Sequence, residues 1–218
     1  MKNFNLLRKS ERKSVGTTLA LTVGSPSFDR RYSALKQLAF MLLFIISSLN
    51  VWGADEVYKT ATFSSSSFSA KTQSYNNNSF YSTTNGFRVD ITNANNNNKG
   101  WEYIKMGYGS SAVTGTITTN AVIDAAITKV GLTIDLITAN KVNSIKLFTK
   151  TTTGSWTEVG TFDKSQGTKY VTLSSPAANL YYKIEVSCAA QKAAIQLSQV
   201  QYYKSGTQEP TDKIASRL

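Results

Sequence analysis

The sequence predicts an all-β fold, an antiparallel β-sandwich or jelly roll, preceded by a signal peptide. Three observations support this prediction. Apolar and polar residues alternate over short segments, polar turns separate these segments about every dozen residues, and proline is scarce, with three residues among 218. Alternation with a period of two is the pattern of a half-buried strand. Short strands at regular spacing are typical of sandwiches.

Residues 35–53 have the pattern of a signal peptide. Lys36 supplies positive charge, Leu38 to Leu49 is an apolar run of about a dozen residues, and small residues follow, so we expect cleavage after Gly53. The run is shorter than the roughly 18 residues that a membrane span needs, so no span is expected after cleavage. Residues 1–34 are basic and rich in serine. They are either a long, disordered amino-terminal extension or the result of a start assigned too early, and we favour the second.

The mature chain is expected to form one sandwich domain over residues 54–204, followed by a disordered tail over residues 205–218. Its period-2 segments predict ten strands, which are Val57–Phe63, Phe87–Thr92, Tyr103–Met106, Val113–Thr118, Lys129–Ile137, Val142–Thr149, Trp156–Phe162, Lys169–Ser174, Leu180–Cys188 and Ile195–Tyr203.

Irregular features between and within these strands can also be predicted. In the Lys129–Ile137 strand, the alternation puts four apolar side chains on one face, namely Val130, Leu132, Ile134 and Leu136. The apolar phase slips near Ser198–Gln199, which indicates a β-bulge. Asn120–Ile127 has the pattern of a helical turn, with Val122, Ala126 and Ile123 facing inward. Thr151–Gly154 and Ser165–Gly167 are expected to be hairpin connections.

Composition excludes several kinds of chemistry. The chain has no histidine, which removes Ser-His-Asp and Cys-His catalysis and histidine zinc sites. Cys188 is the single cysteine, so no intrachain disulfide can form, and its strand phase predicts a buried, inert thiol. No two carboxylates stand out as a catalytic pair. We therefore expect no enzyme, no catalytic residues and no metal or other cofactor, with only a weak structural calcium ion left open near Asp90 and Glu102.

The segment Asn93–Tyr103, NANNNNKGWEY, is the first candidate binding site. Amides can bond to sugar hydroxyls while an aromatic ring stacks on the C–H face of the sugar, and a loop beside a rigid sheet suits such a site. The candidate ligand-binding residues here are Asn96, Asn98, Trp101 and Tyr103. The alternative is that the asparagine run is only a turn and that the two aromatic residues pack at the edge of the core.

A second segment, Tyr75–Tyr81, has the same composition, and it adds Tyr75 and Tyr81 as candidates. The two segments would line one rim if the strand order brought them together. The net charge of +11 suggests nucleic acid as a partner, but more than half of it lies in residues 1–53, and the rest is spread thinly. A solvated basic surface is the interpretation that we prefer for the mature domain.

The segment from Val142 to Ser174 resembles the strand–GxW–strand hairpin of galactose-binding-like, discoidin-type β-sandwich domains. The matching residues are Gly154, Trp156, Glu158 and Val159, and the closing AIQLSQVQYY is similar to their final strand. The chain also resembles secreted domains of Bacteroidetes-like bacteria. The resemblance implies a jelly-roll-like sandwich with an accessory binding or adhesive role. The resemblance implies that Trp156 packs in the core, and it identifies no ligand-binding residues in this chain.

These observations together predict a secreted, non-catalytic binding module, extracellular or periplasmic, for a glycan or a cell-surface partner. Two alternatives stay open. The first is a nucleic-acid-binding accessory domain of a secreted nuclease system, supported by the mixture of lysine and tyrosine. The second is a structural or self-assembly domain without a ligand.

Overall fold

The computed structural model describes residues 53–97, 101–190 and 194–206. The predicted extension and signal peptide lie outside the described residues, apart from Gly53, which begins the first strand. The last strand continues to Gly206, so Ser205 and Gly206 belong to the sheet and not to the predicted tail. No helix in these three ranges is long and apolar enough to cross a membrane.

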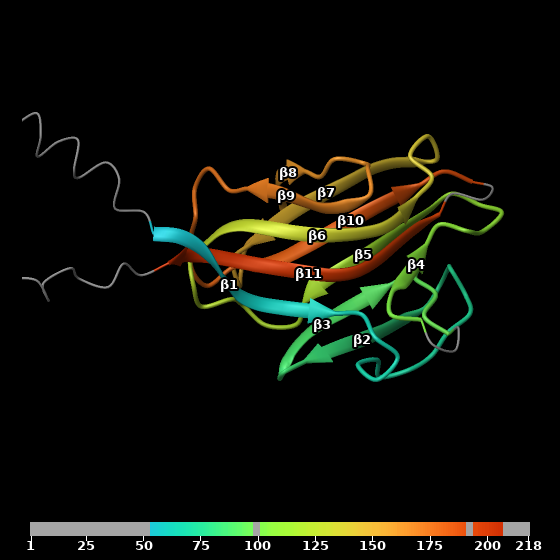
Figure 1. Ribbon diagram of the computed structural model, residues 1–218, viewed down its shortest axis with the longest axis horizontal. Helices are drawn as coiled ribbons and strands as arrows, with labels where there is room; N and C mark the ends of the chain where they lie inside the picture. Colours follow the sequence, from blue (N-terminus) through green and yellow to red (C-terminus); the bar gives the residue numbers. More distant parts are fainter. Residues whose placement is uncertain (1–52, 98–100, 191–193, 207–218) are drawn as a thin grey trace, which may run out of the picture. The chain divides into compact units, whose positions relative to one another are not determined.

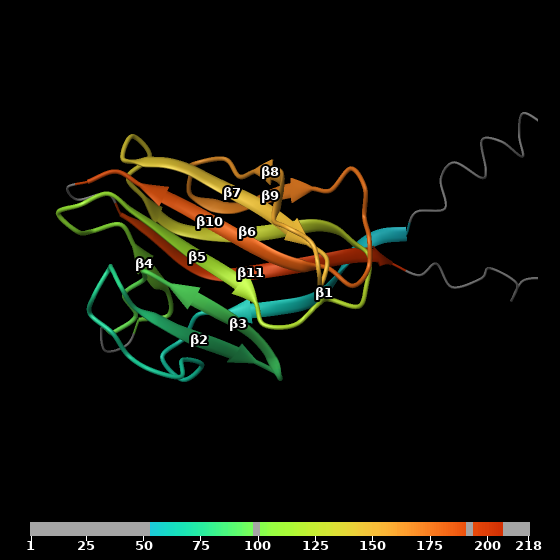
Figure 2. The ribbon, with the colours of Figure 1, turned by 180° about the vertical axis from the view of Figure 1, so that it is seen from behind.

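Two antiparallel sheets form a β-sandwich (Figure 1), as predicted. Figure 2 shows five strands of the larger sheet side by side, from β7 through β10, β5 and β3 to β2. The smaller sheet, sheet A, has the order β1 (Gly53–Thr62), β11 (Ile195–Gly206), β6 (Ile127–Ile137) and β9 (Gly167–Thr172), with β4 (Ile104–Met106) also paired to β11. The larger sheet, sheet B, has the order β2 (Ser79–Thr84), β3 (Phe87–Thr92), β5 (Val113–Thr119), β10 (Tyr181–Cys188), β7 (Val142–Lys150) and β8 (Thr157–Thr161).

The core lies between the two sheets, and alternation along the strands builds it. On β10, every second side chain is buried, including Tyr182, Ile184 and Cys188, while the residues between them are partly exposed. The buried position predicted for Cys188 is confirmed. Each fully buried aliphatic side chain contributes roughly 1.5–3 kcal/mol to folding, so this shared apolar layer is the main source of stability.

The bulge predicted near Ser198–Gln199 is confirmed, and it has a role in the sheet. Residues 199–206 of β11 pair with β1, while residues 195–197 pair with β4 on the same edge. At Ser198, between the residues that pair with β4 and those that pair with β1, the backbone carbonyl accepts a hydrogen bond of 2.8 Å from the Phe63 N–H. The short β4 is thereby held at one corner of the sandwich, together with the loops that lead into and out of it.

All ten predicted strands are present, but an eleventh, β2, was not predicted. β2 is joined to β3 by the two-residue turn Asn85–Gly86, in which both residues have positive φ, 48° and 77°. This is the geometry of a tight hairpin turn for which Asn-Gly is the preferred sequence. The Asn-Gly pair was therefore a signal that could have revealed the strand before it.

Two local predictions about loops are wrong. The segment Asn120–Ile127 is not helical, because Ile123 pairs with Leu180 as an isolated bridge, with an N–H to carbonyl distance of 2.9 Å. Ile123 is buried, but Ala126 is exposed. Ser165–Gly167 is not a hairpin connection, because β8 and β9 lie in different sheets and the segment crosses from one to the other. Thr151–Gly154 does join paired strands, β7 and β8.

The prediction that Leu136 lies on the buried face of its strand is also wrong. The register between β6 and β11 shifts after Ile134, so that Leu136 pairs with Gln196 and Ile134 with Leu197. The extra residue, Asp135, reverses the phase, and Leu136 is 40% exposed instead of buried.

Candidate functional site

Hydrogen bonds join the two asparagine-rich segments of the sequence. The buried Asn96 makes the central contacts: its Oδ1 accepts a bond of 2.8 Å from the Thr72 N–H, and its Nδ2 donates one of 2.8 Å to the Ala70 carbonyl. Asn95 Nδ2 donates to the Gln73 carbonyl, also at 2.8 Å. Residues 70–73, directly before the Tyr75–Tyr81 segment, are thereby held against the Asn93–Tyr103 segment.

Backbone pairing fixes this rim to the sheet. Asn95 forms a two-bond bridge with Lys105 of β4, at 2.8 and 2.9 Å. Asn78 meets the end of β3, where its carbonyl accepts from the Asn93 N–H at 3.1 Å and its Oδ1 from the Ala94 N–H at 3.2 Å. The loops are thus positioned by amide groups with defined partners rather than by apolar packing alone.

Four aromatic residues gather on these loops, and we call them the aromatic loop surface: Tyr75, Trp101, Tyr103 and Tyr108. The Trp101 and Tyr103 rings stack with centroids 4.6 Å apart and an angle of 26° between planes. The Tyr75 and Tyr108 rings are tilted by 47° at 5.9 Å. Lys105 places its Nζ 4.2 Å from the Tyr108 ring centroid. Tyr108 is 48% exposed, and the other three rings are partly exposed.

Two tyrosines of this surface, Tyr75 and Tyr103, are neutral hydrogen-bonding groups at ordinary pH, because the pKa of each is raised. Burial raises the pKa of Tyr75; the Asn95 side chain lowers it, and the nearby phenols of Tyr108 and Tyr103 raise it further. Burial also raises the pKa of Tyr103, with the Asp135 carboxylate adding to the shift. The surface can therefore offer flat apolar faces edged by neutral hydroxyl and amide groups.

The six residues predicted to form the binding site do not all lie together. Trp101, Tyr103 and Tyr75 lie together on the surface. Asn96 is 2% exposed and its amide is already bonded on both sides, so it supports the loops and we leave it out of the site. Asn98 lies outside the described residues. Tyr81 lies on β2, where the Arg88 guanidinium carbon sits 3.8 Å from its ring centroid.

Sequence reasoning missed Tyr108. It lies between two glycines, Gly107 and Gly109, directly after β4, and Gly107 has a positive φ of 81°. An aromatic residue between glycines in a loop is a signal that was available. In the three described ranges, no group of three or more acidic or cysteine side chains could hold a metal ion. The Asp90 carboxylate accepts hydrogen bonds from Arg88 and Asn120.

Trp156 is not the packing tryptophan that the resemblance implied. It lies just before β8, half-buried, with the Nζ of Lys150 and of Lys183 at 5.0 and 5.2 Å from its ring. Lys183 also lies 4.4 Å from the Phe148 ring, and Lys150 lies 5.2 Å from the Tyr181 ring. We call these five residues the lysine–aromatic ladder. Its other four residues are alternate side chains of β7 and β10 that point away from the core, and Trp156 packs beside them on this outer face, which explains why it does not reach the core.

The chain matches no protein-family model and no curated protein sequence. Among solved structures it is similar to CBM32-1 from a family 31 glycoside hydrolase of Clostridium perfringens, with 11% identity, a TM-score of 0.34, and coverage of 47% of this chain and 77% of that one. It is also similar to the family 32 CBM from C. perfringens NanJ in complex with galactose, with 15% identity, a TM-score of 0.32, and coverage of 67% of this chain and 100% of that one.

Proposed function

We propose that this chain is a secreted, non-catalytic module that binds glycan through the aromatic loop surface. The observation that carries the proposal is the stacked pair Trp101–Tyr103, at 4.6 Å, beside the pair Tyr75–Tyr108. A flat, partly exposed aromatic face can pack against the C–H face of a sugar ring. Loop amides and tyrosine hydroxyls around it can bond to the sugar hydroxyls.

The way the loops are held supports this role. The hydrogen bonds of Asn95 and Asn96 fix these two residues against residues 70–73 before any ligand arrives. A preformed site loses less conformational entropy on binding than a mobile one, which favours recognition by a small number of contacts. Export rests on the signal-peptide pattern of residues 35–53. A free extracellular glycan and a glycan on a cell-surface partner would both present sugar hydroxyls and C–H faces to the site.

A glycan array tests the proposal directly. The purified protein is expected to bind a subset of glycans, and Trp101→Ala is expected to abolish that binding because half of the stacked pair is lost. Far-UV circular dichroism and the thermal midpoint should stay close to those of the unsubstituted protein, since Trp101 is partly exposed. Normal array binding by Trp101→Ala, or its unfolding, would remove this site assignment.

Trp156→Ala is the matched control, because it removes the same type of side chain from a half-buried position beside sheet B, just before β8. It is expected to leave array binding unchanged. Loss of glycan binding in Trp156→Ala but not in Trp101→Ala would move the site to the lysine–aromatic ladder and contradict the proposal.

The lysine–aromatic ladder favours a second candidate function, binding of single-stranded nucleic acid. Rings between lysines can stack on bases while the ammonium groups meet phosphates. Against this, Lys183 is paired with Glu185 at 3.1 Å, which reduces the positive charge. A DNA-retention assay tests this second function. Retention that falls steeply with salt and is lost in Trp156→Ala would support binding of nucleic acid by the lysine–aromatic ladder. No retention at low salt would remove it.

A further inference from the structure

A pocket of about 340 Å³ lies at the other end of β3 from the aromatic loop surface. The aromatic loop surface follows the end of β3 at Thr92, whereas the pocket is lined by Phe87 at its start, so the two are separated by the length of the strand. We call it the hairpin pocket, because the Asn85–Gly86 turn borders it. Its volume is at the lower end of the range for small-molecule sites.

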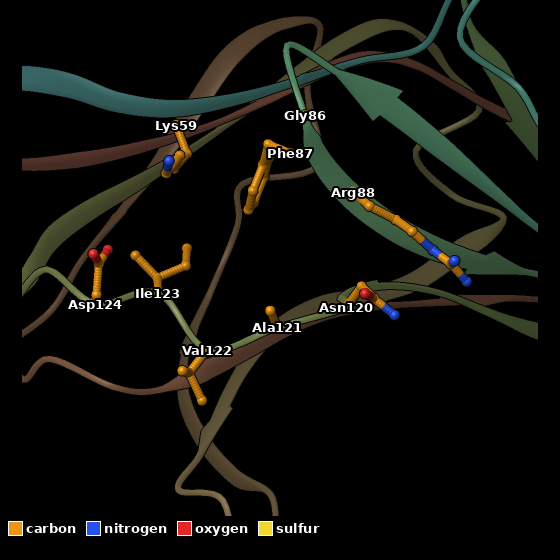
Figure 3. A pocket seen from close by; sticks show the side chains of 9 residues that line it. All are labelled: Lys59, Gly86, Phe87, Arg88, Asn120, Ala121, Val122, Ile123 and Asp124. Atoms are coloured by element: carbon orange, nitrogen blue, oxygen red, sulfur yellow. The ribbon is translucent and has the colours of Figure 1, made fainter.

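The polar groups of the pocket are unevenly placed (Figure 3). Lys59 and Asp124 lie on one side, with the Asp124 carboxylate directed toward Lys59, and the Phe87 ring projects beside them. On the other side, the Arg88 side chain points away, and its guanidinium bonds to Asp90 at 2.9 and 2.7 Å. Lys59 and Asp124 are therefore the charged groups that a ligand would meet.

Neighbouring contacts hold Asp124 in place. A register shift in β1 between Val57 and Lys59 re-aims the strand at Tyr58. The Tyr58 hydroxyl then donates a hydrogen bond of 2.5 Å to Asp124 Oδ1. That hydrogen bond lowers the pKa of Asp124, and the charges of Lys59 and Lys204 add to the effect. Asp124 is thus an exposed, ionised acceptor whose Oδ2 is not used by Tyr58.

The apolar part of the pocket is equally fixed. The Phe87 ring packs edge-to-face on the buried Tyr202, with centroids 5.6 Å apart and an angle of 77°. Ile123 is buried and bonded through its backbone to Leu180. Ala121 and Val122 complete this wall. The ring of Phe87 is therefore a rigid apolar face next to a charged pair.

These features select the chemical class of the ligand. Lys59 forms no ion pair within the described ranges, so its ammonium can donate hydrogen bonds, and Asp124 can accept them. A net negative ligand would be opposed by Asp124, and a net positive one by Lys59. A ring that carries neighbouring hydroxyls has no net charge, can bond to both groups at once, and presents an apolar face to Phe87.

The geometry points to the hairpin pocket as a second binding site, which takes a single neutral sugar residue. It uses none of the residues of the aromatic loop surface, so it does not depend on that site. A chain with sites at both ends of β3 could engage two sugar residues or two glycan chains at once, which raises avidity when both are presented on one surface.

Titration of the purified protein with D-galactose, D-glucose, D-mannose and N-acetyl-D-glucosamine tests this inference, with saturation-transfer NMR as the readout. Binding of at least one of these sugars is expected in the protein carrying Trp101→Ala, which disables the loop surface. In that background, Lys59→Met and Asp124→Asn should each weaken binding at least about tenfold, since each removes a charged hydrogen-bonding partner. High salt should change the affinity little, because the ligand is neutral.

Tyr58→Phe is the control for Asp124→Asn. It removes the Tyr58–Asp124 bond but keeps the carboxylate, so it should retain sugar binding if Asp124 acts on the ligand. The inference is overturned if none of the four sugars binds in the Trp101→Ala background, or if Lys59→Met and Asp124→Asn bind as tightly as their parent. Tighter binding of glycine, a zwitterion, than of any of the sugars would also overturn it. The glycan array tests the loop surface separately, because it reports only glycans that stay bound through washing, whereas saturation-transfer NMR at millimolar sugar also reports the weak binding of a single sugar residue in the hairpin pocket.

Discussion

The side-chain oxygen of Asn96 accepts a 2.8 Å hydrogen bond from the backbone N–H of Thr72, across 24 residues of sequence. The same amide donates to the Ala70 carbonyl, so one side chain forms hydrogen bonds with two backbone groups of a distant loop. In the absence of the Asn96 side chain, the Thr72 N–H and the Ala70 carbonyl would each lose a hydrogen-bond partner next to the core. The aromatic loop surface depends on this contact, because it holds the segment that carries Tyr75 against the segment that leads to Trp101.

Asn96→Ala is therefore expected to lower the free energy of unfolding by at least about 2 kcal/mol, since it leaves a donor and an acceptor unpaired in a buried position. Urea denaturation followed by tryptophan fluorescence measures the change. Asn97→Ala is the matched control, because the Asn97 side chain makes no hydrogen bond in the part of the chain that the structure describes; it should change stability by less than about 0.5 kcal/mol. Equal effects of the two substitutions would contradict the structural role of Asn96.

Gly160 on β8 lies close to Val171 on β9, where the edges of the two sheets meet. A Cβ at position 160 would collide with the Val171 Cγ1 methyl. Val171 is β-branched and buried, so it cannot turn aside easily. Gly160→Ala is expected to cost about 1–3 kcal/mol of stability. Gly109→Ala, whose Cβ would meet no atom closer than 3.9 Å, should be close to neutral.

The double substitution Gly160→Ala with Val171→Ala separates this collision from a general loss of strand stability. If the collision is the cause, the pair should cost less than the sum of the two single changes in thermal unfolding. Strict additivity would show that the closeness of these two residues has no energetic consequence.

The strands of the core could be predicted from the sequence because their apolar side chains alternate without interruption. On β2 the alternation is disguised: Phe80 points inward, but so does Ser82, whose hydroxyl lies within hydrogen-bonding distance, 2.8 Å, of both the Thr62 carbonyl and Ser67 Oγ. A buried serine with distant partners looks like a surface residue in the sequence. The Asn-Gly turn was the better indicator of this strand.

The candidate site could be predicted only in part, for a related reason. Four identical asparagines follow one another at positions 95–98, and nothing in the run shows that Asn96 is buried, because its partners lie in another loop. Similarly, Trp156 in a strand-like segment could face either side of a sheet. Which side it takes is decided by the pairing of β7 with both β8 and β10, which a local pattern does not contain.

Tyr202 and Tyr182 have buried hydroxyls without a hydrogen-bond partner in the described ranges, and their rings meet edge-to-face at 5.4 Å. An unpaired buried hydroxyl is unfavourable, so removing it should not cost stability. Tyr202→Phe is expected to leave the free energy of unfolding unchanged or to raise it by up to about 1 kcal/mol. Tyr203→Phe is the control, because the Tyr203 hydroxyl donates to Gln201 Oε1 at 2.9 Å and its loss should be mildly destabilising. A marked loss of stability in Tyr202→Phe would mean that its hydroxyl has a partner in solution.

Cys188 provides a chemical test of the core. Its side chain is 1% exposed, and burial raises the pKa of its thiol to about 11. Because only the thiolate reacts with iodoacetamide, the native protein should be alkylated very slowly at pH 8, and the rate should rise about tenfold per pH unit until the pH approaches 11. In denaturant, where the thiol has the pKa of an ordinary cysteine, labelling at pH 8 should be complete within the usual reaction time. Mass spectrometry of timed samples measures both rates. Rapid labelling of the native protein at pH 7 would mean that β10 opens readily at this position and that the core between the sheets is not closed there.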